Sequence, residues 1–214
     1  MKIILISGKA EAGKTTAANF LKEELESRGE RVAITPYGRL LKDLCNMLYG
    51  WDGQKDEAGR QLLQHFGTDV IRKEDPDYWV SHIIRLSGLL YNEFDALIVD
   101  DCRFPNELEA WDDHARWAEK WVKKHYDIYW LRIERPGYEN HLTPEQRLHP
   151  SETALDGYEL PVLSWINSKY VYNIQRLDMT TVLSEDASMS LFKQRVIDAF
   201  DDLSEDNRRE SSDD

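Results

Sequence analysis

The sequence predicts an α/β fold of three layers, in which a parallel five-stranded sheet is flanked by helices and carries a lid segment. Short apolar runs typical of strands alternate with helix-like segments along the chain. Most of these runs are continuously apolar, as expected for strands buried on both faces of a sheet. With 214 residues, 41% of them hydrophobic, the chain has enough material for one compact domain with its own core.

The N-terminal quarter predicts two strands, each followed by a helix. Lys2–Ile6 is apolar and β-branched, as in a buried strand. Thr15–Arg28 spaces its apolar residues as a helix does, and Gly29 is placed to end that helix. Arg31–Thr35 predicts a second short strand, and Leu40–Tyr49 predicts a second helix.

The middle of the chain predicts three helices around a central strand. Arg60–His65 and Trp79–Tyr91 have helical patterns. Phe94–Val99 is the most apolar run and predicts the central strand of the sheet. Residues 105–122 place their apolar side chains at helical spacing, and proline suits the first turn of this helix.

The C-terminal part predicts two more strands, a lid, a helix and a tail. Ile128–Ile133 and Tyr170–Ile174 are the predicted strands, and Leu191–Phe200 is the last predicted helix. Residues 135–160 hold proline, glycine and polar residues without a period, so we expect a long loop or lid there. Residues 204–214 are expected to form an acidic, disordered tail.

Composition excludes several classes of partner. The chain has 27 Lys and Arg against 40 Asp and Glu, a net charge of −13, and so lacks the basic surface that non-specific nucleic-acid binding needs. No apolar stretch approaches the roughly 20 residues of a membrane span. Cys45 and Cys102 lie far apart and are interpreted as small buried hydrophobic residues. We expect a cytoplasmic protein with no nucleic-acid or membrane partner.

A phosphate-binding loop follows the first predicted strand. Residues Gly8–Thr15 read GKAEAGKT and fit the pattern Gly-x4-Gly-Lys-[Ser/Thr], which is typical of P-loop NTPases. The glycines let backbone N–H groups converge on phosphate oxygens, and the next helix adds its positive N-terminus. Lys14 is expected to reach the β- and γ-phosphates of ATP, and Thr15 to ligate Mg²⁺. The expected nucleotide-binding residues are Gly8, Lys9, Ala10, Glu11, Ala12, Gly13, Lys14, Thr15 and Thr16.

Two aspartates follow the predicted central strand. Asp100 and Asp101 lie where a carboxylate would hold Mg²⁺ directly or through water. Side chains alternate along a strand, so only one of the two should face the metal. The sequence leaves open which one does; Asp100 is taken as the candidate ligand together with Thr15.

Three classes of P-loop protein compete at this stage. A guanine-nucleotide switch needs an Asn-Lys-x-Asp-like run, and the nearest string, 167–170, lacks the aspartate. An ATPase acting on polymers favours basic grooves, which suit an acidic chain poorly. A small-molecule kinase needs cations for the acceptor phosphate and a mobile cover that excludes water. The available cations, which together favour the kinase, are Arg39, Lys42, Arg60, Arg72, Arg103, Arg132, Arg135 and Arg147.

Four stretches of the sequence resemble the deoxynucleoside monophosphate kinases of bacteriophages, relatives of the adenylate-kinase-like group. They are ISGKAEAGKTT, YGRLLKDLCNMLYG, GRQLLQHFGTDVIRKEDPDYWV and VDDCRFPNELEA. HPSETALDGY at His149–Tyr158 is similar to the lid of that family. The resemblance implies one kinase domain at 1–203, with a monophosphate-binding region at about 36–92 and the lid at about 135–160.

The resemblance also implies a reaction and roles for residues. The reaction would transfer the γ-phosphoryl of ATP to a deoxynucleoside 5′-monophosphate, with Mg²⁺, in the host cytoplasm if the protein is phage-encoded. Arg60 and Arg103 would clamp the acceptor phosphate, and Trp79 would pack on the base or sugar. Asp101 and Glu107 would accept hydrogen bonds from the nucleotide or order Arg103. The implied catalytic residues are Lys14, Asp101, Arg103 and Arg135. The implied substrate-binding residues are Lys42, Arg60, Gln64, Arg72, Trp79, Asp101, Arg103 and Glu107.

Two alternatives stay open. One is another small-molecule kinase of the same fold, such as one for dephospho-coenzyme A. The other is an ATP-binding regulatory protein with no acceptor. The sequence does not specify the preferred base, or whether ribonucleotides are excluded. A homodimer is a reasonable expectation for such kinases, but no motif supports it.

Overall fold

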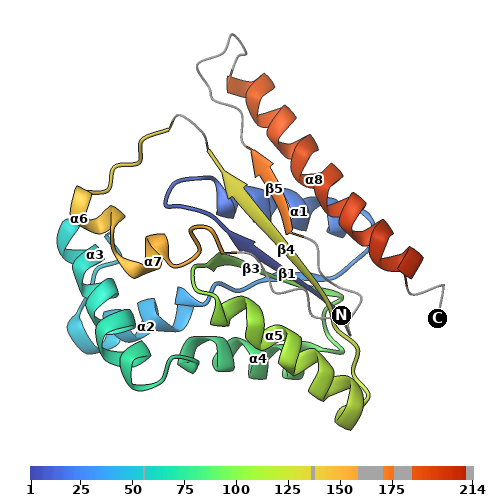
Figure 1. The fold of residues 1–214 in the computed structure, drawn as a ribbon, viewed down its shortest axis with the longest axis horizontal. Coiled ribbons are helices and arrows are strands. Elements are labelled where there is room, and N and C mark those ends of the chain that lie inside the picture. Colours follow the sequence, from blue (N-terminus) through green and yellow to red (C-terminus); the bar gives the residue numbers. More distant parts are fainter. Residues whose placement is uncertain (55, 136–137, 159–170, 176–184, 211–214) are drawn as a thin grey trace.

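A sheet of five parallel strands forms the middle layer of the protein. The computed structural model describes residues 1–54, 56–135, 138–158, 171–175 and 185–210. Within them the strand order is β2-β3-β1-β4-β5, and every neighbouring pair is parallel (Figure 1). The strands are β1 (Lys2–Ser7), β2 (Val32–Ile34), β3 (Ala96–Cys102), β4 (Asp127–Glu134) and β5 (Val171–Gln175). The predicted α/β fold with a helix-flanked parallel sheet is confirmed.

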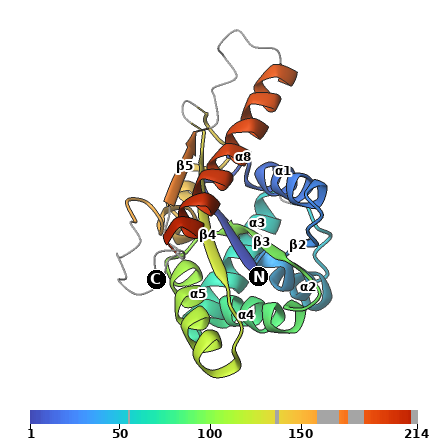
Figure 2. The ribbon, with the colours of Figure 1, turned by 90° about the vertical axis from the view of Figure 1, so that its right-hand side faces the viewer.

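Helices cover both faces of the sheet. Helices α1 (Lys14–Ser27) and α8 (Glu185–Glu210) pack on one face, and α4 (Tyr78–Leu90) and α5 (Asn106–Trp117) pack on the other (Figures 1 and 2). Alternate residues of β1 belong to these two cores, so residues 3–6 of this strand are all apolar. The three layers follow from this two-sided burial.

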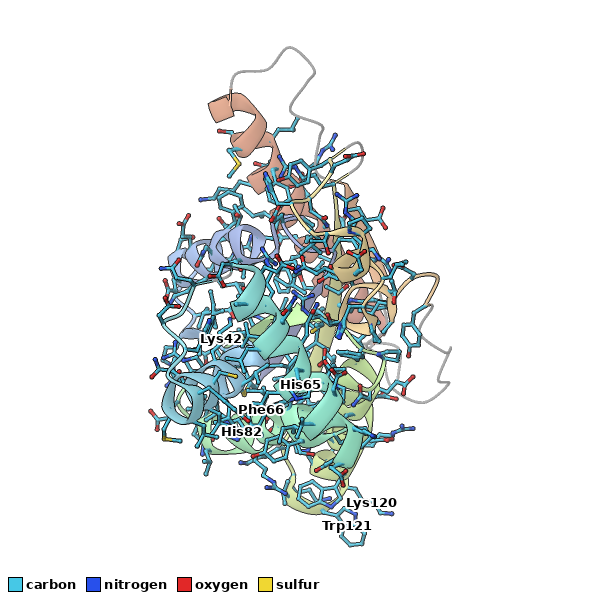
Figure 3. The ribbon with its side chains drawn as sticks, turned by 90° about the vertical axis from the view of Figure 1, so that its left-hand side faces the viewer. Lys42, His65, Phe66, His82, Lys120 and Trp121 are labelled. Atoms are coloured by element: carbon cyan, nitrogen blue, oxygen red, sulfur yellow. The ribbon has the colours of Figure 1, made fainter. Side chains whose placement is uncertain are left out.

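A group of helices between β2 and α4 lies to one side of the sheet. It consists of α2 (Gly38–Tyr49), α3 (Glu57–Gln64) and a π-helical segment, η1 (His65–Arg72), that continues α3 (Figures 1 and 3). The helix predicted at Arg60–His65 is therefore longer than expected. Gly67 allows this close packing, because a Cβ there would lie 2.6 Å from Cδ2 of Leu41 on α2.

The lid region contains two short helices where a loop was expected. They are α6 (Pro144–Arg147) and α7 (Pro150–Thr153), which lie on the same side of the sheet as α2 and α3 (Figure 1). Each begins with a proline, and Thr143 and Gln146 cap α6 reciprocally. Helices of four residues are too short to give a hydrophobic period, so the sequence pattern did not reveal them.

The C-terminal helix is longer than predicted. Helix α8 runs from Glu185 to Glu210, whereas the sequence predicted a helix at Leu191–Phe200 and a disordered tail from Ser204. Apolar side chains continue at helical spacing as far as Leu203, which is buried against the sheet, and Ser204 is buried beside it. That continued period extends the helix. Residues 211–214 of the expected tail and the string 167–170 lie outside the described residues.

The last five residues of the helix predicted at 105–122 form a π-helical segment, η2 (Ala118–Val122), which continues α5. Among the described helices, none combines the length and the apolar character needed to cross a bilayer.

Candidate functional site

The loop between β1 and α1 has the backbone geometry of a phosphate cradle. Gly8 has φ +146°, and a Cβ there would lie 2.4 Å from the carbonyl oxygen of Ile133 on β4, so only glycine fits. Gly13 has φ +106° and precedes α1 without a capping side chain. The first N–H groups of α1 are thus left available to an anion.

Lys14 lies at the start of α1 and points back into this loop. It is 9% exposed, and its Nζ donates to the carbonyl oxygens of Gly8 at 2.9 Å and Lys9 at 2.8 Å. Burial and then the positive charge of Arg103 lower the pKa of Lys14 from 10.5 to about 8, against nearby carboxylates that raise it. The ammonium is therefore charged at neutral pH, but the nearby negative charge does not offset its burial. This is expected for a group that binds a phosphate.

Thr15 and Asp100 form the candidate metal site. Thr15 Oγ1 donates to Oδ2 of Asp100 at 2.6 Å, and Asp100 is buried at the end of β3. A hydroxyl and a carboxylate are the hard oxygen ligands that Mg²⁺ prefers, and Mg²⁺ usually takes its other ligands from phosphates and water. No group of three or more His, Cys, Asp or Glu in the described part of the chain could hold a metal by itself. The residues fit a Mg²⁺ ion that arrives with a nucleotide.

Asp101 points away from Thr15, as strand alternation requires. Its carboxylate oxygens accept hydrogen bonds from the backbone N–H groups of Tyr37 at 2.6 Å and Gly38 at 2.8 Å. Burial raises the pKa of Asp101, and these N–H groups and Arg103 oppose that rise. Asp101 thus fixes the start of α2.

Glu107 organises the two arginines nearest to it. Its carboxylate is almost fully buried and accepts from the backbone N–H of Arg103 at 2.6 Å and from Nη2 of Arg72 at 2.5 Å. Burial raises the pKa of Glu107, and the Arg72 charge opposes that rise. Of the two roles expected for Glu107, these contacts correspond to the ordering of Arg103.

A cavity of about 930 Å³ opens beside the phosphate loop. Lys14, Thr15 and Asp100 line it at the loop, and Ala10, Glu11, Gly13 and Thr16 also contribute. Its remaining wall contains all the predicted substrate-binding residues. They come from α2, α3, η1, α4, the end of β3, the loop that follows it and the start of α5: Lys42, Arg60, Gln64, Arg72, Trp79, Asp101, Arg103 and Glu107. Figure 3 shows the molecule from the side of α2, α3 and η1, with Lys42, one of these lining residues, labelled.

Aromatic side chains contribute to the wall in a way that the sequence did not show. Trp79 is only 4% exposed, and its indole N–H donates to the carbonyl of Gly67 at 3.1 Å, so it offers little ring surface to a ligand. Phe104 also lines the cavity, and the Arg72 guanidinium lies 3.9 Å from the centre of its ring. Phe104 follows Arg103 directly in the resembling stretch, but no role was predicted for it.

A second cavity, of about 390 Å³, lies between the loop and the lid, where Gly8, Lys9, Ala10 and Ala12 line it. Arg135 also lines it, with its guanidinium 3.5 Å from the ring centre of Tyr138 and Nη1 3.4 Å from the carbonyl of Glu11. Arg147 lines neither of the two cavities and donates instead to the carbonyl of Asn140. Arg135 and Arg147 both fall within the predicted lid, at about 135–160, and of the two only Arg135 lies at the loop.

Glu11 is a loop residue whose contacts the sequence did not predict. Its carboxylate accepts from Tyr138 Oη at 2.9 Å and from the backbone N–H of His141, lies 2.9 Å from the His141 Nδ1, and is 3.8 Å from Arg60 Nη2. Burial would raise the pKa of Glu11, but the hydrogen bonds from His141 and Tyr138 lower it overall. Glu11 therefore joins the loop to the lid.

Comparison with known proteins gives one family and several similar folds. The model of the family described as "AAA domain" matches residues 4–149. No curated protein sequence is significantly similar to the chain.

Three solved structures illustrate the similarity of fold. A gluconokinase from Sinorhizobium meliloti 1021 is 12% identical, with 98% of this chain and 97% of that chain covered and a TM-score of 0.48. A thymidylate kinase from Ehrlichia chaffeensis is 13% identical, with 93% and 98% covered and a TM-score of 0.46. The Mycobacterium tuberculosis APS kinase CysC in complex with AMPPNP and APS is 13% identical, with 94% and 97% covered and a TM-score of 0.41. At these identities and TM-scores the likeness carries no conclusion about the reaction or the substrate of this chain.

Proposed function

The chain belongs to the AAA domain family and has the α/β P-loop kinase fold, and from this we propose that it is a deoxynucleoside monophosphate kinase. It would transfer the γ-phosphoryl of ATP to a deoxynucleoside 5′-monophosphate and release ADP and the diphosphate. At the coarser level, this makes the protein a phosphotransferase that acts on a small molecule. The assignment of a deoxynucleoside monophosphate as the acceptor rests on the four stretches that resemble the phage kinases.

The observation that carries the proposal is the continuity of the larger cavity. One space of about 930 Å³ reaches from Lys14 and Thr15 to a wall that carries Lys42, Arg60 and Arg72. A volume of that size is typical of small-molecule sites. A donor phosphate on the loop and an anionic acceptor against that wall would share the cavity, as phosphoryl transfer requires.

The loop would bind the phosphoryl donor. Lys14 and the backbone N–H groups of α1 would hold the phosphates, and Thr15 and Asp100 would hold Mg²⁺. Bound Mg²⁺ would neutralise part of the phosphate charge. Transfer would then depend on positioning and charge, without a general base. Arg135, beside the loop, would add positive charge from the lid.

The cationic wall would bind the acceptor. Arg60 and Arg103 would contact the acceptor phosphate. Arg72 would present a guanidinium already fixed by Glu107 and stacked on Phe104. Lys42 forms no ion pair with another described residue, so its charge would be available to the acceptor.

We also propose a division of the domain. Residues 36–92 would form the acceptor-binding region, and residues 138–158 would form the described part of a lid that lies over the loop. Asp101 and Glu107 would act as positioning residues, since their oxygens are occupied by protein N–H groups. A homodimer in the cytoplasm is the proposed state of the protein.

A coupled ADP-release assay tests the proposal. Purified protein is incubated with ATP and Mg²⁺ against dAMP, dGMP, dCMP and dTMP, their ribose counterparts, and dephospho-coenzyme A, with Lys14→Ala as the inactive control. Turnover with at least one deoxynucleotide supports the kinase and identifies its substrate. Turnover with dephospho-coenzyme A alone would refute it in favour of the other small-molecule kinase. ATP binding without turnover on any acceptor would favour a regulatory protein.

A further inference from the structure

Glu152, on the lid helix α7, makes contacts with the phosphate loop that neither the sequence nor the proposed reaction explains. Its side chain is only 7% exposed. One carboxylate oxygen accepts a hydrogen bond from the backbone N–H of Ala10 at 2.9 Å, and the other accepts from Nη1 of Arg103. The Nζ of Lys9 donates to the backbone carbonyl of the same residue. Glu152 is thus held by the loop and by the end of β3.

These partners form a donor set suited to a phosphate. A backbone N–H of a Gly-rich loop and a guanidinium are groups that bind phosphate oxygens in proteins. Two oxygens of Glu152 therefore stand among groups expected to bind a phosphate.

A second lid carboxylate strengthens this arrangement. Asp156 lies 2.5 Å from Nζ of Lys9 and 3.9 Å from Nη2 of Arg132. The lid thus pairs Lys9, Arg103 and Arg132 with two carboxylates of its own. A bound phosphate close to these carboxylates would be repelled by them.

We propose that Glu152 occupies part of the phosphate site as an internal anion when no nucleotide is bound, and that an incoming phosphate displaces it. The inference rests on the donor-binding half of the proposed function and does not depend on the identity of the acceptor. Displacement would release the lid helix α7 from Ala10 and free the guanidinium of Arg103 for the substrates. Nucleotide binding and movement of the lid would then be coupled through this one carboxylate.

The first test compares the affinity of three proteins for inorganic pyrophosphate by isothermal titration calorimetry at low ionic strength. The proteins are the wild type, Glu152→Gln and Glu139→Gln. Glu139 is an exposed lid residue, so its variant controls for the change in net charge. We expect Glu152→Gln to lower the Kd about fivefold or more, the usual size of coupling between two binding events, and Glu139→Gln to leave it nearly unchanged. Equal or weaker binding by Glu152→Gln would overturn the inference.

The second test uses the wild type alone, so it does not depend on the folding of a variant. Hydrogen–deuterium exchange is measured with and without pyrophosphate. We expect slower exchange in residues 8–16 and faster exchange in residues 149–156, because the lid helix loses its contacts with the loop. Slower exchange in both segments would mean that the lid closes on the phosphate, which contradicts displacement.

The two proposals fail in different ways. Tighter pyrophosphate binding by Glu152→Gln, without turnover of any deoxynucleotide, would refute the acceptor assignment and leave the internal anion standing. Turnover by the wild type, with no effect of Glu152→Gln on pyrophosphate affinity, would do the reverse. Absence of pyrophosphate binding in all three proteins would overturn both.

Discussion

Replacement of Lys14 by methionine should remove activity and also remove a burial cost that the wild type bears at neutral pH. Lys14 keeps a charge in a site where it is 9% exposed, and its pKa falls from 10.5 to about 8. The difference of about 2.5 between these values corresponds to roughly 3 kcal/mol, at 1.36 kcal/mol for each pKa unit. The wild type bears this cost below pH 8, where Lys14 is charged in both the folded and the unfolded state.

The dependence on pH isolates this effect from the loss of packing and hydrogen bonds. Between pH 8 and 10.5 the folded protein releases the Lys14 proton while the unfolded chain keeps it, so the stability of the wild type rises with pH. Lys14→Met has no such group. Its stability relative to the wild type should therefore fall by about 3 kcal/mol between pH 7 and pH 10.5, because terms that do not titrate cancel.

Urea denaturation of both proteins at the two pH values measures this difference. The same substitution at Lys22, a residue of α1 whose side chain is 39% exposed, serves as the control and should show no comparable change. In thermal melts, 3 kcal/mol corresponds to roughly 6–12 °C for a chain of this size. If the stability difference between Lys14→Met and the wild type is the same at pH 7 and pH 10.5, the assignment of a burial cost to Lys14 is wrong.

Three further predictions concern the cavity and the loop. Arg103→Ala should raise the acceptor KM tenfold or more, with a smaller loss of kcat, because the binding free energy of a hydrogen bond to a charged group corresponds to about that factor. If steady-state kinetics gave a KM equal to that of the wild type, Arg103 would not belong to the acceptor site. Thr15→Val keeps the shape of the side chain but removes the hydroxyl that donates to Asp100. Because that hydroxyl is a proposed Mg²⁺ ligand, the Mg²⁺ concentration for half-maximal turnover should rise several-fold. If that concentration did not change, the proposed metal site would be wrong. Gly8→Ala should destabilise the protein by about 2 kcal/mol or more, because the φ angle of this residue is +146° and the new Cβ would lie 2.4 Å from the carbonyl oxygen of Ile133. A denaturation midpoint equal to that of the wild type would contradict this geometry.

Local features of the sequence predicted the fold and the residues around the cavity. The five strands and the loop at Gly8–Thr15 are contiguous segments, so period and motif identify them directly. The orientation of Asp100 and Asp101 depends on how β3 pairs in the sheet, and the sequence therefore left it open. The contact of Ala10 with Glu152 joins residues 142 positions apart, and no local pattern reports such a pair.

The two ends of the candidate site are joined by one peptide unit. Asp100 faces the nucleotide loop through Thr15, and Asp101 holds the first N–H groups of the helix that begins the acceptor-binding region. Consecutive Cα atoms are about 3.8 Å apart, whatever side chains surround them. On the proposed function, covalent geometry therefore sets the offset between donor and acceptor. Substitutions in α3 and η1 could change which acceptor binds without increasing the distance over which the phosphoryl group is transferred. Acceptor specificity can therefore change in evolution while the residues that carry out the transfer stay the same.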